Sequence, residues 1–162
     1  MPGWRLGYVA FPKALADDFR KIQDTNPTHA CILSQRLALA CLDVDQAASS
    51  GTATGGWIEQ QVRGLDAVRS ALRLVLEPLG TVWTSGAIYF LVPLPAGVTE
   101  HEAVDLLARR YGVLLMLGEP FGAPGHLRLS YGSLPPGDAL GAVGRLKEGF
   151  SALSNLSRER RA

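Results

Sequence analysis

Two arginines, Arg5 and Arg128, are the residues of this sequence whose type and setting best suit binding chemistry. Each lies in an otherwise apolar stretch, Arg5 within residues 4–11 and Arg128 within residues 127–131. A guanidinium is a planar, permanently charged donor that grips a carboxylate or phosphate through two parallel hydrogen bonds. An arginine in an apolar strand therefore either faces solvent or pairs with an anion, and taken alone the pattern favours the solvent-facing interpretation. The glycine-rich residues 118–125 shift this balance towards a ligand, because such a loop lets the backbone approach one closely.

No complete catalytic motif accompanies these arginines. The sequence has no GxxxxGK[ST] phosphate loop and no GxSxG nucleophile elbow. His29, His101 and His126 are scattered, which is typical of surface or capping histidines rather than of a catalytic base. Glu119, next to Pro120, is interpreted as an exposed loop acid. We therefore assign no catalytic residue from the sequence.

The two cysteines, Cys31 and Cys41, do not indicate a disulfide or a metal site. Ten residues along one helix separate two side chains by about 15 Å, which is too far for a disulfide. Neither a CxxC pair nor a histidine cluster accompanies them, so no metal is expected. We expect two reduced, buried thiols.

The bulk composition is that of an ordinary globular protein. The chain has 162 residues, 47% of them hydrophobic and 19% charged, and its formal net charge is +1. This balance provides no field that would attract nucleic acid or an anionic membrane. No apolar run approaches the ~20 residues that a membrane-spanning helix needs. We expect a soluble protein, most simply cytoplasmic, with no nucleic-acid or membrane partner.

The first third of the chain is expected to contain one strand and two helices. Residues 4–11 are aromatic and branched and stop at Pro12, which predicts a strand. Apolar residues at helical spacing then predict a helix through residues 15–22 and a second, buried one over residues 29–42. Small polar residues make 46–56 a flexible loop and the best domain boundary.

From residue 56 onward the pattern predicts an α/β layer. Residues 58–79 carry apolar side chains in steps of three and four, as one long amphipathic helix does. Thr99 followed by Glu102 is a capping box, which predicts that a helix begins there. The expected order is helix, strand, helix, strand, strand, helix, with helices packed on an open sheet; the five later elements are 86–94, 99–111, 113–117, 127–131 and 140–153.

Residues 3–8 (GWRLGY), 86–90 (GAIYF), 118–122 (GEPFG) and 127–132 (LRLSYG) together resemble fold-type I, class I/II aminotransferases, enzymes that depend on pyridoxal 5'-phosphate. The motifs occur in the family's order, and the resemblance covers nearly the whole chain. It implies that residues 1–50 are the C-terminal remnant of the large cofactor-binding domain and that 51–162 are the small domain. Residues 21–24 and 34–37 are similar to plant and algal members acting on methionine and aromatic amino acids.

The resemblance also implies residue roles. Arg5 matches the arginine that binds the cofactor phosphate, and Arg128 matches the one that clamps the substrate α-carboxylate. The complete family member transfers an amino group between an amino acid and a 2-oxo acid, and it works as a homodimer. One departure is Leu117, which stands where the family commonly has proline before the glycine of the late loop.

The family binds its cofactor covalently through a lysine that would lie just upstream of Gly3. Lys13 and Lys21 follow the motif and do not match that lysine. We expect that Met1 is an internal methionine of a longer protein and that this chain alone does not transaminate. Because the N-terminus of the longer protein would then be missing, the sequence carries no information about organelle import. We also expect the isolated chain to be poorly soluble, while residues from about 55 onward fold by themselves.

Two other functions remain open at this point. In the first, the chain is a truncated protomer that binds and regulates a full-length aminotransferase, because the apolar helix over 29–42 resembles interface material. In the second, it is an unrelated small α/β domain in which Arg128 binds a carboxylate. Co-purification with an intact homologue would favour the first, and carboxylate binding that does not depend on the cofactor would favour the second.

Overall fold

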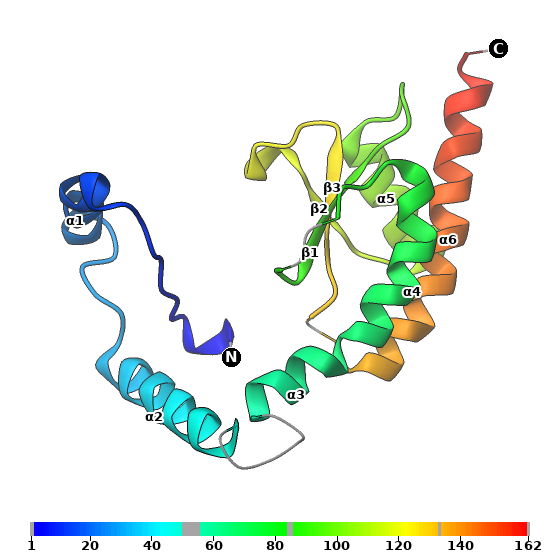
Figure 1. Cartoon of the computed structure of the whole chain (residues 1–162). Coiled ribbons are helices and arrows are strands. Elements are labelled where there is room, and N and C mark those ends of the chain that lie inside the picture. Colours follow the sequence, from blue (N-terminus) through cyan, green and yellow to red (C-terminus); the bar gives the residue numbers. More distant parts are fainter. Residues whose placement is uncertain (1, 50–55, 84–85, 133, 162) are drawn as a thin grey trace. The chain divides into compact units, whose positions relative to one another are not determined.

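A computed structural model of the chain describes residues 2–49, 56–83, 86–132 and 134–161, and it divides into two compact units (Figure 1). The first unit is Met1–Gln60 and the second is Gln61–Ala162. None of the helices in the described part of the chain is long and apolar enough to cross a membrane.

The first unit is helical in its described residues. Its elements are the 3-10 helices η1 (Pro2–Trp4) and η2 (Lys13–Leu15) and the helices α1 (Ala16–Thr25) and α2 (Ile32–Ser49), and α3 (Trp57–Gly64) crosses its boundary. The helix expected through 15–22 is confirmed, with Asp17 and Asp18 in its first turn. The strand expected over 4–11 is wrong, because a strand needs a partner for its backbone groups, and all three strands in the described residues lie in the second unit.

Helix α2 is longer and more exposed than expected. It begins at Ile32 rather than at residue 29 and continues to Ser49, so it includes the first residues of the expected 46–56 loop. Residues 50–55 of that loop lie outside the described residues. The expectation of a buried helix is wrong for this unit, since Leu33 and Val44 are 68% and 66% exposed.

A three-stranded antiparallel sheet forms the centre of the second unit. Its strands are β1 (Tyr89–Pro93), β2 (Met116–Leu117) and β3 (His126–Ser130), in the order β1-β3-β2. All three expected strands are present, but each is shorter or displaced by a residue. The reason is pairing: the first and last residues of β1, Tyr89 and Pro93, pair with the last and first residues of β3, and only two residues of the 113–117 stretch find partners on β3.

Three helices, α4 (Asp66–Leu76), α5 (Glu100–Tyr111) and α6 (Pro136–Glu159), pack in the second unit, with both α4 and α5 against α6 (Figure 1). The single helix expected over 58–79 is interrupted: α3 ends at Gly64, α4 starts at Asp66, and η3 (Glu77–Leu79) closes the run. Glycine is the weakest helix former after proline, and Leu65 makes a tighter i to i−3 hydrogen bond to the Val62 carbonyl at the break.

The capping box expected at the start of α5 is confirmed. The Thr99 hydroxyl accepts from the Glu102 N–H at 3.3 Å, and the Glu102 carboxylate accepts from the Thr99 N–H at 3.0 Å. Arg160, after the end of α6, donates to the same carboxylate and to the Gly97 carbonyl. The end of α6 is therefore tied to the start of α5.

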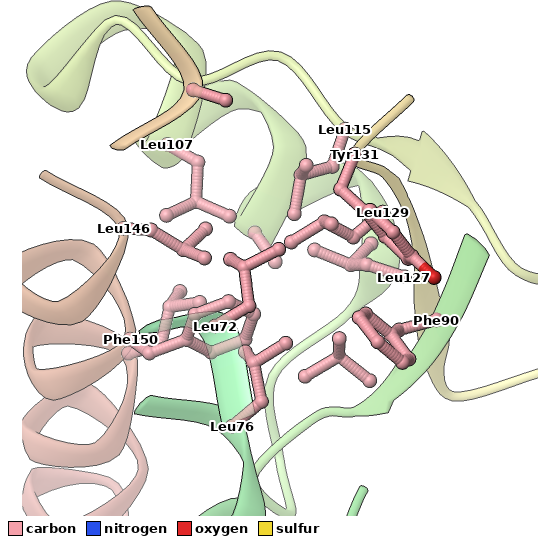
Figure 2. Packing of buried hydrophobic residues seen from close by; sticks show 14 of the residues in the cluster. Leu72, Leu76, Phe90, Leu107, Leu115, Leu127, Leu129, Tyr131, Leu146 and Phe150 are labelled. Atoms are coloured by element: carbon pink, nitrogen blue, oxygen red, sulfur yellow. The ribbon is translucent and has the colours of Figure 1, made fainter. Parts of the chain in front are cut away.

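Among the described residues, the hydrophobic core lies entirely in the second unit. Leu72 and Leu76 from α4, Phe90 from β1, Leu107 from α5 and Phe150 from α6 meet in it, and Figure 2 shows these side chains converging. The remaining members are Val68, Val92, Val98, Ala103, Leu115, Leu127, Leu129, Tyr131, Ala139, Leu146 and Leu153. The expected α/β layer, in the expected element order, is confirmed.

Candidate functional site

Arg128 lies on the face of the sheet that is turned away from the core. On β3 its neighbours Leu127 and Leu129 are 0% and 4% exposed, whereas Arg128 is half-buried on the other face. Successive side chains of a strand point to opposite faces, so burial of the two leucines places the arginine outward. In the ladder Arg128 pairs with Leu91 of β1 on one side and Met116 of β2 on the other.

The Arg128 guanidinium is held between two aromatic rings. Its Cζ atom lies 4.0 Å from the centre of the Phe121 ring and 4.7 Å from the centre of the Tyr89 ring. Nη2 donates to the Met116 sulfur at 2.8 Å. Cation–π contacts of this kind orient a guanidinium without neutralising it. The charge is thus fixed in place while its capacity to bind an anion is left open.

One donor of this guanidinium is unsatisfied. Arg128 Nε is buried and has no hydrogen-bond partner among the described residues, none of whose carboxylates pairs with the side chain either. A buried polar group without a partner is costly, so such an atom indicates an acceptor that the chain itself does not supply. Arginine's paired donors suit a planar carboxylate.

A groove of about 640 Å³ opens along this face of the sheet. Arg128 and His126 line it from β3, Tyr89 and Leu91 from β1, and Phe121 from the loop before β3. Apart from the arginine and the histidine, the described lining side chains are apolar or aromatic. The arrangement suits a ligand with one carboxylate and an apolar or aromatic remainder.

Arg5, the other expected site residue, belongs to the first unit. It is exposed, its φ is 52°, and its guanidinium makes no hydrogen bond or ion pair with the described residues. A positive φ is uncommon for a residue other than glycine. The two arginines therefore lie in different units.

In the described part of the chain, no group of three or more histidines, cysteines or acids is placed to hold a metal ion. Lys13, Lys21 and Lys147 are all exposed. The expectation of buried thiols is wrong for Cys31, which is exposed just before α2, while Cys41 is half-buried, and both are free.

Sequence reasoning missed four residues that surround Arg128 or its loop: Tyr89, Met116, Phe121 and Glu100. Phe121 and Tyr89 were inside the motifs quoted for the family resemblance, so an aromatic at each of these positions was a usable signal. Met116 follows only from the strand register. Glu100 carries no local signal, because an acid in the first turn of a helix is ordinarily explained by the helix dipole.

Comparison with known proteins gives a family match over most of the chain. The family model described as aminotransferase class I and II matches residues 1–146. An aromatic aminotransferase (ISS1) of Arabidopsis thaliana is 38% identical over 160 residues, which are 94% of this chain and 38% of that protein. The chain thus spans about two fifths of the length of this relative.

Solved structures of the same kind share the fold. An aspartate aminotransferase of Thermus thermophilus with maleate has a TM-score of 0.65 and 29% identity, over 92% of this chain and 38% of that one. LysN, an α-aminoadipate aminotransferase of the same species in complex with N-(5'-phosphopyridoxyl)-L-leucine, has a TM-score of 0.63 and 23% identity. It is covered to 38% of its length by 91% of this chain.

Proposed function

The chain belongs to the class I and II aminotransferases, and from this premise we propose that it supplies the two anion-binding arginines of such an enzyme. In this proposal Arg128 binds the α-carboxylate of an amino acid or 2-oxo acid. Arg5 binds the phosphate of pyridoxal 5'-phosphate. The complete protein transfers an amino group between the two substrates as a homodimer, in the cytoplasm.

The observation that carries the proposal is the unpaired Arg128 Nε. It is buried at the groove, the guanidinium is oriented by Tyr89 and Phe121, and no acid of the described residues neutralises it. A carboxylate arriving in the groove would supply the missing acceptor and a charge-assisted pair of hydrogen bonds. The aromatic rings would contact the rest of the ligand. An aromatic or methionine-type amino acid fits this lining, and the Arabidopsis relative, named an aromatic aminotransferase, supports that choice.

The cofactor assignment rests on Arg5 and on the family. The Arg5 guanidinium is exposed and pairs with none of the described residues, which makes it chemically suited to a phosphate. When bound in a family member, pyridoxal phosphate supplies the electron sink for amino transfer. This chain would contribute one phosphate contact and the carboxylate anchor, and we assign none of Lys13, Lys21 and Lys147 as the residue that bonds to the cofactor.

The domain assignment is part of the same proposal. Residues 1–50 would correspond to the end of the large cofactor-binding domain and residues 51–162 to the small domain. The described residues of the first unit contribute no side chain to the hydrophobic core. Its large apolar side chains are mostly exposed, as expected for a segment that packs on other parts of a larger domain.

The carboxylate role is tested by titrating the ¹⁵N-labelled chain with maleate and following the backbone amide resonances of the groove residues Tyr89, Leu91 and Phe121. We expect a saturable shift in the wild type and none in Arg128→Leu, because only the wild type has the paired N–H donors of the Arg128 guanidinium. Arg110→Leu removes an exposed helix arginine and is the matched control, which should bind as the wild type does. Equal binding by Arg128→Leu would refute the carboxylate role.

The cofactor role is tested with pyridoxal phosphate followed by borohydride reduction and mass spectrometry. We expect weak binding that Arg5→Ala reduces, and no stoichiometric adduct at a single lysine. A stoichiometric adduct at Lys13 or Lys21 would overturn the assignment, because the chain would then hold the cofactor covalently by itself.

A second candidate function is regulation of an intact aminotransferase by docking. The exposed apolar side chains of α2, Ile32, Leu33, Leu39, Leu42 and Val44, favour it. Co-expression with a full-length homologue decides between the two. A stable mixed dimer with altered activity would support docking, and separate elution would exclude it.

A further inference from the structure

The loop between β2 and β3, residues 118–125, is a closed turn that carries Phe121 to Arg128. Inside it the Phe121 N–H donates to the Gly118 carbonyl at 2.8 Å, and the Gly122 N–H donates to the Glu119 carbonyl at 3.0 Å. Gly118 has no room for a side chain, since a Cβ there would overlap the carbonyl oxygens of Ala123 and His126. The loop is therefore tightly folded, and the position of its two ends decides where Phe121 lies.

A single carboxylate holds both ends of this loop. Glu100, the first residue of α5, accepts through Oε2 from the N–H groups of Gly118 (2.8 Å) and Glu119 (3.2 Å). Its other oxygen, Oε1, accepts from the Gly125 N–H at 2.6 Å. The Gly125 carbonyl in turn accepts from the Leu94 N–H just after β1. Glu100 thus joins the start of α5, both ends of the loop and, through Gly125, the end of β1.

The charged form of Glu100 is the one that makes these bonds. Desolvation raises the pKa of its carboxyl, but hydrogen bonds from the backbone of Glu119, Gly125 and Gly118 outweigh it, and the pKa is lowered from its ordinary value of 4.5. An ionised carboxylate is an acceptor only, with two oxygens for several N–H groups. A glutamine of the same size has one acceptor oxygen and an NH₂ group that would face an N–H donor.

We propose that Glu100 is a positioning residue for Arg128: its carboxylate sets the 118–125 loop so that Phe121 stacks on the guanidinium and aims it into the groove. Glu100 does not touch Arg128, and it acts through the loop and the Phe121 ring, which lies 4.0 Å from Arg128 Cζ. The relevance to substrate binding rests on the proposed function of Arg128. The positioning itself does not, because it is a property of the chain without ligand.

The test compares Glu100→Gln with Glu119→Gln and Phe121→Ala in the full ¹⁵N-labelled chain. Hydrogen exchange of the amides of residue 119 and Gly125 reports the loop anchors, since the Gly118 N–H also donates to the His126 carbonyl at 2.9 Å. The Arg128 Nε–Hε resonance, assigned by its loss in Arg128→Leu, reports the guanidinium. In Glu100→Gln we expect exchange about tenfold faster or more, the size expected when hydrogen bonds to a charged acceptor are lost. We also expect the Arg128 resonance to move in the direction that Phe121→Ala moves it. Glu119→Gln removes the same charge from the loop and should change neither.

Two results overturn the proposal. Faster amide exchange with an unmoved Arg128 resonance would mean that Glu100 holds the loop but does not position the arginine. Unchanged exchange in Glu100→Gln would mean that the side chain only fills space, since glutamine has the same shape.

Two further measurements complete the design. If Glu100→Gln fails to fold, acid titration of the Glu119→Gln chain replaces it. The amide signals of residue 119 and Gly125 and the Arg128 signal must then move together below pH 4.5. Maleate binding is measured separately on the same samples. Failure to bind maleate in the wild type would refute the proposed function and leave the positioning result intact.

Discussion

Replacing Phe150 with alanine tests whether the stability of this chain resides in its second unit. Phe150 is 2% exposed on α6 and points into the core cluster shown in Figure 2. Removing a buried phenylalanine side chain costs about 3–5 kcal/mol through lost burial and the cavity left behind. A domain of this size has about 5–15 kcal/mol of stability in total. The substitution should therefore remove a large fraction of it.

The same change in the first unit is the matched control. Phe11 is 39% exposed, and its ring stacks on Phe19 with centroids 4.2 Å apart. An aromatic pair of this kind contributes about 0.5–1.5 kcal/mol locally, and neither ring belongs to the core cluster. We expect Phe11→Ala to leave the cooperative transition of the core where it is in the wild type.

Thermal melts followed by near-UV circular dichroism provide the readout. At about 4–8 °C per kcal/mol for a domain near 100 residues, Phe150→Ala should lower Tm by more than about 10 °C. Equal losses in the two variants would refute the reasoning, because the two units would then unfold as one cooperative structure. A wild-type melt with two separate transitions, of which Phe150→Ala moves only one, would support it most directly.

Three further predictions concern the second unit. Thr99→Ala should lower the urea midpoint by the equivalent of about 1 kcal/mol, because the α5 cap is lost, whereas an unchanged midpoint would show that the cap is dispensable. The pKa of Glu102 is lowered from 4.5 to about 2, mainly by the Arg160 hydrogen bond and then by the Thr99 cap. The ionised carboxylate therefore stabilises the fold at pH values above 4.5, and this stabilisation is lost as the pH falls towards 2. Arg160→Ala should raise the NMR-measured pKa of Glu102 and shift acid unfolding to higher pH. Gly118→Ala should disorder the 118–125 loop by overlap with two backbone carbonyls, which proteolysis within the loop would detect, while Gly122→Ala, strained only by its φ of 73°, should be milder.

Local patterns in the sequence were sufficient for several elements. The capping box at Thr99 and Glu102, the acidic start of α1 and the alternation around Arg128 each predicted a structure that is present. These features depend on neighbours three or four residues away, or on alternate residues of one strand. The pattern could not reveal the break after Gly64, because the apolar spacing continues through it.

Other features depended on what lies next to them in space. The stretch around Arg5 has strand-like composition but no partner strand in the described residues, and the apolar α2 has little to cover it within its unit. The composition of a segment indicates which structure it favours when partner strands or packing neighbours are present. It does not show whether those partners are present.

By itself the sequence determined the family resemblance, the α/β order of the second unit and the two arginines worth testing, because motifs and hydrophobic periodicity involve residues that are close together along the chain. Only the tertiary structure decided what surrounds Arg128: the rings of Tyr89 and Phe121, the unpaired Nε, and the Glu100 carboxylate that holds the loop from 18 to 25 residues away. Contacts between residues so far apart arise from strand register and helix packing, and no local pattern encodes them.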